Sequence, residues 1–488
     1  MTGVLLNALD TYNYVILAYF IILNSTYVWM TTVAYRQLPV YAYRVRSLDI
    51  QDLLLSAAAP PVTIVAPAYN EEATCVESVR SLLTLDYPEY EVLVVNDGSK
   101  DNTLRALKDA FDLVPASRFP TSKLGTAAIN GIYQCMSHPN LWVIDKQNGG
   151  KADALNVGIN HCMTPFFCAI DADSLLEREA LMRIVRPLIH DNRTVAAGGM
   201  IRIANGCNVR AGEVTQIQLP RNLLARFQVV EYFRAFFSGR VGLSESQLTL
   251  IISGAFGLFR RQAVAEAGGF ASARTTGETV GEDMELVVRL HRHCREHDQP
   301  YSVTFVPDPA AWTECPESLR ILGRQRDRWQ RGLYDSLMRH RKMLLNPRYG
   351  RVGLFAYPYF FFLELWGPLI ELTGYVTFAI AVGLGRASSA FIVTFTVAAV
   401  VLGFSLSVAA IGLEELTFRR YERWRDFYHQ FLLALLENLG YRQLSVYWRV
   451  RGMWFAFRKK GTWGKMERKG FTVLQNNQSR LNPNGKQR

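Results

Sequence analysis

The apolar residues of this chain fall into two kinds of segment, long runs near the ends and short runs between them. Residues 14–33 carry no charge over about the 20 positions that a bilayer requires. Residues 353–385 and 389–411 are also apolar enough to span a bilayer, and the polar turn 386–388 separates them. The pattern predicts a soluble domain between membrane helices, one before it and two after it.

The middle of the chain alternates short β-branched runs with helical patterns. Buried strands that alternate with helices are typical of a parallel sheet covered on both faces. Ligands of such sheets bind at the carboxyl ends of the strands, where we expect Asn70, Asp97 and Asp171 to emerge. The predicted strands are residues 62–67, 91–99 and 166–170, and the predicted helices are residues 71–84 and 103–111.

The first apolar run has a second interpretation, a cleaved signal peptide. It lacks a basic segment before it, since Asp10 is the only charge there, and no small-residue cleavage site follows. We therefore favour a membrane helix. Because Arg36, Arg44 and Arg46 follow the run, the positive-inside rule predicts an outside N-terminus and a cytoplasmic chain from Arg36 onward.

The formal net charge of +11 has two main interpretations, nucleic-acid binding and contact with lipid headgroups. Nucleic-acid binding would concentrate basic residues on the soluble domain, among aromatic side chains. Much of the excess lies instead beside apolar segments, which favours membrane lipids as partners and argues against nucleic acid. These basic residues are Arg419, Arg420, Arg423, Arg425, Arg449, Arg451, Arg458, Lys459, Lys460, Lys465, Arg468 and Lys469.

These patterns divide the chain into five parts joined by short linkers. All seven cysteines fall in the soluble part; their odd number and the lack of a Cys-x-x-Cys spacing argue against a disulfide framework and a zinc site. The parts are 12–35, an N-terminal transmembrane helix; 60–345, a cytoplasmic domain with interfacial helices; 351–412, two transmembrane helices; 425–470, an interfacial or re-entrant helical hairpin with a basic segment; and 471–488, a polar tail.

Three acidic sites in the soluble part are candidates for chemistry. Asp171 and Asp173 follow a predicted buried strand, and two such carboxylates suit Mg²⁺ or Mn²⁺ shared with substrate phosphates. Taken alone, this pair could be a solvated turn, Asp97 a simple Asp-Gly-Ser turn, and Glu282-Asp283 a helix start with acids at the positive end of its dipole. Their order along the chain, each beside an element end, favours a catalytic site.

The segment Gln325-Arg326-Asp327-Arg328-Trp329 lies between the acidic sites and the second apolar block. Its arginines, with Arg324 and Arg331, could form a basic helix face that rests on lipid headgroups. The acids upstream favour a catalytic role beside the membrane instead. The sequence thus indicates an enzyme that works at the membrane face.

These motifs, taken in order, resemble the family-2 membrane glycosyltransferases that include cellulose, chitin, hyaluronan and poly-N-acetylglucosamine synthases. The resemblance covers roughly residues 60–335, and it implies an α/β fold: a Rossmann-like GT-A cytoplasmic domain that binds a nucleotide-sugar, with α-helical transmembrane segments. The motifs are Pro67-Ala68-Tyr69-Asn70-Glu71-Glu72, Asp97-Gly98-Ser99, Gly149-Gly150-Lys151-Ala152-Asp153-Ala154-Leu155-Asn156, Asp171-Ala172-Asp173, Ser253-Gly254-Ala255, Gly281-Glu282-Asp283 and Gln325-Arg326-Asp327-Arg328-Trp329.

The resemblance implies roles in donor binding for the first motifs. Asn70, Glu72 and Asp97 would line the nucleotide pocket, and Asp97 would accept a hydrogen bond from the uracil. Lys151 would approach the diphosphate. Asp171 would bind the nucleotide and, with Asp173, the metal ion Mg²⁺ or Mn²⁺.

The later motifs are implied to act on the acceptor. Asp283, beside Glu282, would be the general base that takes a proton from the acceptor hydroxyl. Gln325, Arg328 and Trp329 would form the acceptor end of the site, with Arg328 opposing the charge of the departing diphosphate and Trp329 stacking on the acceptor sugar. The chain departs from the cellulose-synthase pattern at one position, because Gly281 stands where a threonine is often found.

The resemblance therefore predicts an inverting, metal-dependent, processive glycosyltransferase in the cell (inner or plasma) membrane. It would polymerise a UDP-sugar, N-acetylglucosamine or glucose, into a β-linked polysaccharide and translocate the growing polysaccharide across the membrane, with or without helper membrane or export proteins. Two alternatives stay open: a non-processive enzyme that adds a single sugar to a lipid acceptor, and a non-catalytic sugar-nucleotide sensor. Intact Asp97, Asp171, Asp173 and Asp283 weigh against the sensor.

Two carboxylates lie inside the apolar block. Glu364 and Glu371 are seven positions apart, hence on one face of a helix that also contains Pro368. Intramembrane carboxylates face either a polar path or a bonding partner on another helix. The sequence leaves both interpretations open: a route for a polar polymer, or hydrogen bonds between helices.

Overall fold

The computed structural model describes residues 2–47, 59–210 and 212–458, and it divides into two compact units. We call them the helical unit (Met1–Val45, Asn222–Leu248 and Pro316–Trp463) and the sheet unit (Arg46–Arg221, Thr249–Cys315 and Gly464–Arg488). The predicted polar tail 471–488, the end of the predicted basic segment and residues 48–58 of the first linker lie outside the described residues.

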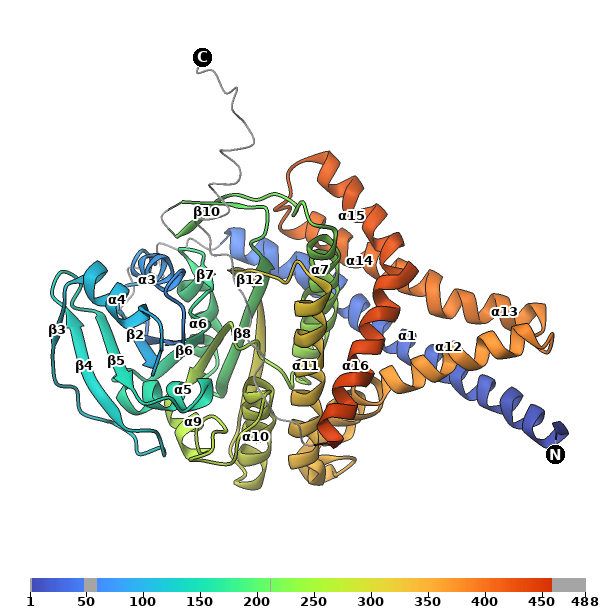
Figure 1. The fold of residues 1–488 in the computed structure, drawn as a ribbon, viewed down its shortest axis with the longest axis horizontal. Helices are drawn as coiled ribbons and strands as arrows, with labels where there is room; N and C mark the ends of the chain where they lie inside the picture. Colours follow the sequence, from blue (N-terminus) through green and yellow to red (C-terminus); the bar gives the residue numbers. More distant parts are fainter. Residues whose placement is uncertain (1, 48–58, 211, 459–488) are drawn as a thin grey trace, which may run out of the picture. The chain divides into compact units, whose positions relative to one another are not determined.

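The sheet unit is built on a ten-stranded sheet with the strand order β3-β4-β5-β2-β1-β6-β11-β8-β12-β7 (Figure 1). Its centre is parallel: β1 (Val62–Ala68) pairs with β2 (Tyr90–Asp97) and β6 (Phe166–Ile170), and β2 pairs with β5 (Leu141–Lys146). These strands include the three apolar runs of the sequence, and the predicted α/β fold is confirmed. The remaining strands are β3 (Leu113–Pro115), β4 (Ile129–Cys135), β7 (Leu175–Leu176), β8 (Thr194–Ile203), β11 (Phe256–Arg260) and β12 (Ser302–Thr313), with the separate pair β9 (Asn208–Arg210) and β10 (Glu213–Gln216).

The sheet is mixed and not wholly parallel as the sequence pattern predicts. Strand β11 runs antiparallel to both β6 and β8, and β4 runs antiparallel to β3 and β5. The pairings of β11 join strands far apart in the chain, so the local alternation of strands and helices does not reveal them. Strand β11 matters for the site because the turn before it carries Ser253 and Gly254.

Helices pack on the sheet and fix where its loops emerge. Helix α5 (Lys151–His161) packs on β1 and β2 so closely that a Cβ added at Gly158 would lie 2.2 Å from Val65 Cγ1. In the apolar core beneath it, Phe167 and Phe259 stack with ring centroids 5.4 Å apart. The other helices of this unit are α3 (Cys75–Leu83), α4 (Thr103–Phe111), α6 (Ala180–His190), α9 (Arg261–Glu266) and α10 (Glu282–Glu296).

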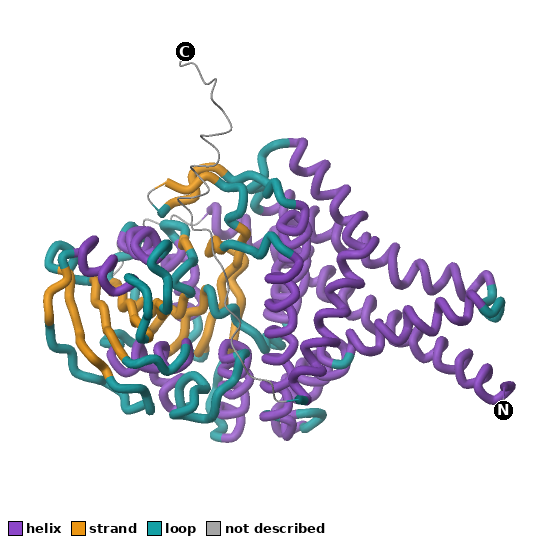
Figure 2. The backbone as a smooth tube through the Cα atoms, viewed as in Figure 1, coloured by secondary structure: helices purple, strands orange, loops and turns teal. Residues whose placement is uncertain are grey.

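The described residues of the helical unit, drawn mainly in purple in Figure 2, contain two helices long and apolar enough to cross a membrane, Asn7–Val45 and Ser389–Thr417. A third stretch, Val352–Leu365 with Gly367–Gly383, passes the same test only as a pair bent by 42°. The bend precedes Pro368 in the first turn of α12 (Gly367–Gly383), where a proline lacks the amide hydrogen that would continue the ladder. The predicted single span over 353–385 is therefore broken in the middle.

The rest of this unit consists of shorter helices. Helices α15 (Trp424–Leu436) and α16 (Arg442–Phe457) lie in the segment 425–470 for which a hairpin is predicted, and the chain leaves helical geometry between them at Leu439 and Gly440. The other elements used below are α1 (Thr2–Ser47), α7 (Leu223–Phe233), α11 (Leu319–Arg339), the π-helix η5 (Tyr359–Leu365), α13 (Ser389–Thr396) and α14 (Leu402–Thr417).

A buried histidine makes the stability of the sheet unit depend on pH. His291 of α10 is 2% exposed, with its ring nitrogens 2.7 Å from the Thr249 carbonyl and 2.9 Å from the Tyr301 hydroxyl. Burial lowers the pKa of His291 to about 4 from an ordinary 6.5. Below pH 6.5 the unfolded chain binds a proton that the folded chain refuses, so folding stability falls as the pH decreases towards 4.

Between pH 7 and pH 5, we expect the free energy of unfolding of the wild type to fall by about 2 kcal/mol more than that of His291→Gln. The expected slope is about 1.4 kcal/mol per pH unit below the pKa of the histidine in the unfolded chain. Chemical denaturation of the detergent-solubilised proteins at both pH values measures this difference. His190→Gln, at the exposed end of α6, is the matched control and should follow the wild type. An equal pH dependence in wild type and His291→Gln would contradict the assignment.

Candidate active site

Two of the predicted donor-binding residues, Asn70 and Glu72, follow β1 and form hydrogen bonds to the loop after β2. Asn70 has a positive φ of 56°, which asparagine tolerates better than most residues, and its Oδ1 accepts from the Lys100 amide at 2.8 Å. The Glu72 carboxylate accepts from the amide and the side chain of Asn102 at 3.2 and 3.1 Å. Both residues are exposed. The structure thus places them where the two loops join, with oxygen lone pairs still open to a ligand.

Asp97, at the end of β2, is buried in contrast to these neighbours. Its carboxylate forms an ion pair with Lys146 and accepts from the amides of Gly149 and Gly150 at 2.9 and 2.8 Å. The side chain of Asn148 donates to Asp97 Oδ2 at 3.2 Å. Lys146 is a residue that the sequence analysis missed, although a lysine at the end of the apolar run of β5 is a visible signal.

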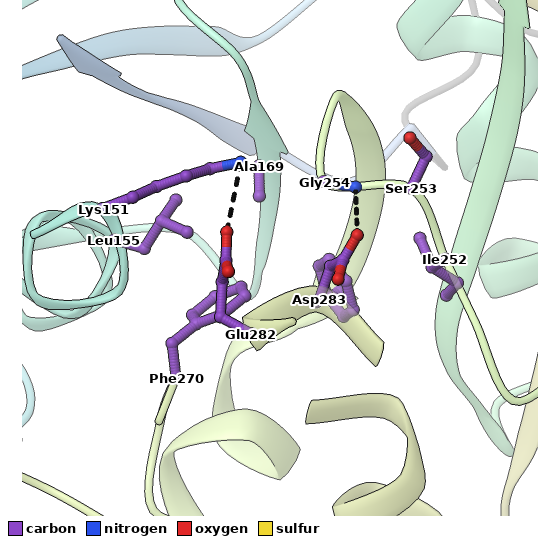
Figure 3. Close-up of a pocket in the computed structure, with 10 residues that line it drawn as sticks. Lys151, Leu155, Ala169, Ile252, Ser253, Gly254, Phe270, Glu282 and Asp283 are labelled. Atoms are coloured by element: carbon purple, nitrogen blue, oxygen red, sulfur yellow. Dashed lines mark hydrogen bonds and ion pairs between the residues drawn. The ribbon is translucent and has the colours of Figure 1, made fainter. Parts of the chain in front are cut away.

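Lys151 is the first residue of α5 and reaches across to the first turn of α10 (Figure 3) and to Asp171 after β6. Its Nζ lies 2.5 Å from Asp171 Oδ1 and 3.5 Å from Glu282 Oε1. Burial works to lower the pKa of Lys151, but the carboxylates of Asp171 and Glu282 outweigh it and raise that pKa. The ammonium therefore stays charged at any physiological pH and is available to bind an anion.

Asp283 faces this group from the first turn of α10 (Figure 3). Its Oδ2 accepts from the Gly254 amide at 3.2 Å, which fixes the carboxylate against the turn before β11. A Cβ added at Gly254 would lie 2.9 Å from Lys151 Nζ. Glycine at position 254 therefore lets the Lys151 ammonium lie close to this turn. Together these residues line a small hollow, whose further lining residues are Leu155, Ala169, Ile252, Ser253, Phe259, Phe270 and Glu282.

The two carboxylates after β6 are the candidate ligands of a divalent cation. Asp173 is 5% exposed, whereas the Asp171 side chain is 32% exposed and holds the Lys151 ammonium. Within the described ranges, no group of three or more His, Cys, Asp and Glu side chains is placed to hold a metal ion. The donor set fits a hard cation such as Mg²⁺ that takes one or two carboxylates and completes its shell with substrate phosphates and water.

The Arg/Trp segment lies on α11 of the helical unit and has two different faces. Gln325 and Arg326 are buried, and Arg326 pairs with Glu231 of α7 at 2.6 Å. Trp329 is 44% exposed, with the Arg326 guanidinium 4.3 Å from its ring centroid. The alternative that the sequence left open was a uniform basic helix face resting on lipid headgroups. The burial of Arg326 disagrees with that alternative. The roles of Gln325, Arg328 and Trp329 towards an acceptor remain predictions.

Helix α16 packs directly on α11 and holds the middle of that segment. Arg451 Nη2 and Nε donate to the Asp327 carboxylate at 2.6 and 3.1 Å. A Cβ added at Gly452 would lie 2.7 Å from the Asp327 carbonyl oxygen, and one added at Gly323 would lie 2.7 Å from Trp448 Nε1. Two glycines thus permit this close packing. The sequence does not reveal the ion pair between Arg451 and Asp327, because the two residues are 124 positions apart.

Gly452→Ala is therefore expected to lower the free energy of unfolding by about 1–3 kcal/mol, since the added carbon meets backbone atoms that cannot turn aside. Thermal unfolding in detergent measures the loss, and glycosyl transfer should fall with it if α11 serves the acceptor. Gly383→Ala near the end of α12 is the matched control, because an added Cβ there meets no described atom within 4 Å. Equal unfolding midpoints for the two variants would refute the packing argument.

Glu364 bonds helices to one another, the second of the two interpretations that the sequence left open. Its Oε1 accepts from the hydroxyls of Tyr27 and Tyr359 at 2.9 and 2.7 Å, and its Oε2 lies 3.1 Å from Arg449 Nη2. Arg449 Nε also donates to Gln330 of α11 at 3.0 Å. The Glu364 carboxylate thus joins α1, η5 and α16, and Arg449 extends the connection to α11.

Comparison with known proteins identifies the family of this chain. The family model described as glycosyl transferase family 2 matches residues 63–268, and that of glycosyl transferase family group 2 matches residues 166–406. The two overlap, and together they span more than half of the 488 residues. The chain belongs to glycosyltransferase family 2. The family resemblance inferred from the seven motifs is thereby confirmed.

Individual relatives of this family 2 glycosyltransferase are distant. It is 26% identical over 281 residues to proteins named poly-beta-1,6-N-acetyl-D-glucosamine synthase from Staphylococcus aureus (strain COL) and from Staphylococcus epidermidis. In both cases the matched region covers 57% of this chain and 56% of the relative, little more than half of each. A mannosyltransferase from Pyrobaculum calidifontis, in complex with GDP-Man and Mn²⁺, matches 88% of this chain and 99% of its own with 19% identity and a TM-score of 0.50. This last likeness shows the fold.

Proposed function

We propose that this family 2 glycosyltransferase is an inverting, metal-dependent, processive enzyme that polymerises a UDP-sugar into a β-linked polysaccharide. The observation that carries the proposal is the hollow lined by Asp283, Lys151 and Glu282, with Asp171 paired to the Lys151 ammonium at 2.5 Å. It combines a carboxylate for proton transfer with a charged ammonium for a diphosphate. The names of the staphylococcal relatives support N-acetylglucosamine as the sugar, with glucose as the competitor.

In the proposed reaction, Asp283 takes the proton of the acceptor hydroxyl as that oxygen attacks the anomeric carbon from the face opposite the leaving group. The bond from the anomeric carbon to the phosphate oxygen breaks, and UDP leaves with the bonding electrons. Lys151 holds the diphosphate, and Arg328 of the helical unit opposes its growing charge. When bound by Asp171, Asp173 and the diphosphate, Mg²⁺ or Mn²⁺ supplies further stabilisation of that charge.

We also propose that the protein crosses the membrane several times, with its sheet unit in the cytoplasm, and that the polymer leaves through the helical unit. Two helices that can span a bilayer and the arginines after residue 33 support this orientation. Support for a polar route comes from buried polar atoms with no hydrogen-bond partner among the described residues, namely Gln325 Oε1, Arg326 Nε and Glu437 Oε2. Water or sugar hydroxyls passing through this unit would satisfy them.

The test is UDP release by purified, detergent-solubilised full-length protein given single UDP-sugars with Mn²⁺ or Mg²⁺, together with the size of the product. We expect one donor to give rapid release and a high-molecular-weight product. Release without polymer would replace the processive proposal with the addition of a single sugar to a lipid acceptor. No release with any UDP-sugar, from folded protein in the presence of membrane lipid, would refute the proposed reaction.

A further inference from the structure

One face of helix α5 carries buried polar side chains. Asp153, Asn156 and Asn160 occupy positions i, i+3 and i+7, which lie on the same side of a helix, and all three are buried. Burying a polar group is costly unless the group is hydrogen-bonded. Each of these side chains therefore needs fixed partners, and the two asparagines bind the backbone of segments far away in the chain.

Asn156 binds both backbone groups of Phe270. Its Oδ1 accepts from the Phe270 amide at 2.7 Å, and its Nδ2 donates to the Phe270 carbonyl oxygen at 2.9 Å. A Cβ added at Gly269 would lie 2.5 Å from Asn156 Oδ1, and the positive φ of 72° at Gly269 also favours glycine. Residues 267–270, which follow α9 and which we call the corner, are therefore shaped to receive Asn156.

Arg289 of α10 binds the same corner. Its guanidinium donates to two carbonyl oxygens of the corner, that of Gly269 at 2.5 Å. Glu285, one turn earlier on α10, accepts from Arg289 Nε and Nη2 at 2.9 Å and so fixes the guanidinium. The corner is thus bonded to two helices, α5 and α10, whose first turns carry Lys151 and Asp283.

The chain between the corner and α10 has a further bond to α5. Arg274 Nη1 lies 3.4 Å from Asp153 Oδ2. The Asp153 carboxylate is itself fixed, because it accepts from the Ala127 amide at 3.0 Å and pairs with Lys146 at 2.8 Å. The segment 271–281 is therefore attached to α5 near the start of the helix, while the corner is attached near its middle.

We infer that Asn156 is a positioning residue that holds the corner, and through the corner the first turn of α10, so that Asp283 meets the acceptor hydroxyl. This inference rests on the proposed role of Asp283 as the base. Phe270 lines the hollow together with Lys151 and Asp283, so a shift of the corner reaches the site directly. Asn156 is fully buried and acts on the reaction only through these contacts.

Asn156→Leu removes both bonds to Phe270 at nearly constant side-chain size. A reacting group misplaced by about 1 Å can cost about 100-fold in rate, so we expect glycosyl transfer per folded molecule to fall about 10- to 100-fold. The affinity for UDP should stay within a few-fold of the wild type, because Lys151 keeps its bond to Asp171. UDP release and UDP binding on the same preparation measure the two quantities.

Asn160→Leu is the matched control. Asn160 lies one turn further along α5 and binds both backbone groups of Leu124 at 2.9 Å, in the same way as Asn156 binds Phe270. Leu124 is not in the segment that leads to Asp283. The control should unfold more easily than the wild type yet transfer sugar at a rate within a few-fold of it. Equal losses of transfer in the two variants would overturn the inference, because they would show a general effect on the fold.

A combination of Asn156→Leu with Asp283→Asn shows whether the first residue acts through the second. If it does, the double variant transfers sugar no more slowly than Asp283→Asn alone. Two independent losses would multiply, and that result would overturn the inference. Asn156→Ser covers the case in which Asn156→Leu fails to fold, because the shorter side chain leaves room for a water that bonds to the Phe270 backbone.

Hydrogen exchange keeps this inference apart from the proposed function. The amides of Phe270 and of the first turn of α10 should exchange faster in Asn156→Leu than in Asn160→Leu, whether or not the protein transfers sugar. Equal exchange in the two variants would overturn the inference. Wild-type protein that releases no UDP from any UDP-sugar would refute the proposed function, and the difference in exchange would still show that Asn156 holds α10.

Discussion

Asp283→Asn is expected to lower the rate of glycosyl transfer by about 100- to 10,000-fold, the range over which a positioned general base contributes. An asparagine keeps the size of the side chain and can still accept from the Gly254 amide, but it cannot take the proton of the acceptor hydroxyl. The affinity for UDP should stay near the wild-type value, because Lys151 and Asp171 remain in place. UDP release and UDP binding, measured on the same preparation, separate the two effects.

Asp298→Asn is the matched control for this variant. The residue follows the same helix, α10, at its far end, is exposed, and has a positive φ of 51° that asparagine also tolerates. It should transfer sugar at the wild-type rate. A rate for Asp283→Asn within a few-fold of the control would exclude Asp283 as the base and turn attention to its neighbour Glu282.

The second large effect is expected from Asp173→Asn and from removal of divalent cations. A bound cation contributes several kcal/mol to the stabilisation of a leaving diphosphate, and each 1.4 kcal/mol or so corresponds to a tenfold rate, so we expect a loss of roughly 100- to 1,000-fold. Chelation should lower wild-type activity by the same factor, and added Mn²⁺ should restore it. Asp173→Asn should gain little from Mn²⁺. Binding of Mn²⁺ in the presence of UDP, followed by electron paramagnetic resonance, provides a readout independent of turnover.

Asp112→Asn, exposed after the end of α4 with a positive φ of 45°, makes the same chemical change away from the site and is the control. Two results would contradict the metal assignment. One is full activity of wild-type protein after chelation, and the other is normal Mn²⁺ binding by Asp173→Asn. The first would leave Lys151 and Arg328 as the groups that oppose the diphosphate charge.

The contacts of helix α11 with other helices of its unit limit which substitutions near Trp329 leave α11 in place. Helix α11 carries the Arg/Trp segment, and its buried side is held by Glu231 of α7 and by Arg451 and Arg449 of α16. Because Arg449 also binds Glu364, the break between η5 and α12 is connected to α11 by hydrogen bonds. Substitutions at α16 are therefore expected to act on transfer through the orientation of α11.

Much of the fold was determined by local sequence. The apolar runs 62–67, 91–99 and 166–170 match β1, β2 and β6, and the long apolar segments 14–33 and 389–411 match helices that can span a bilayer. Periodicity and β-branched residues act over a few positions, so a single pass along the chain reveals them. The motifs likewise named Lys151, Glu282 and Asp283, which the fold brings to one hollow, and Asp171, which pairs with Lys151.

Only the tertiary structure decided how those residues are held. It inserted β11 antiparallel between β6 and β8, paired Asp327 with Arg451, and bonded Asn156 to the backbone of Phe270. Each of these contacts joins residues tens to hundreds of positions apart, and no local pattern encodes the partner of a buried charge. A sequence names the groups that can do chemistry, whereas burial and distant partners determine which of them remain free to meet a ligand.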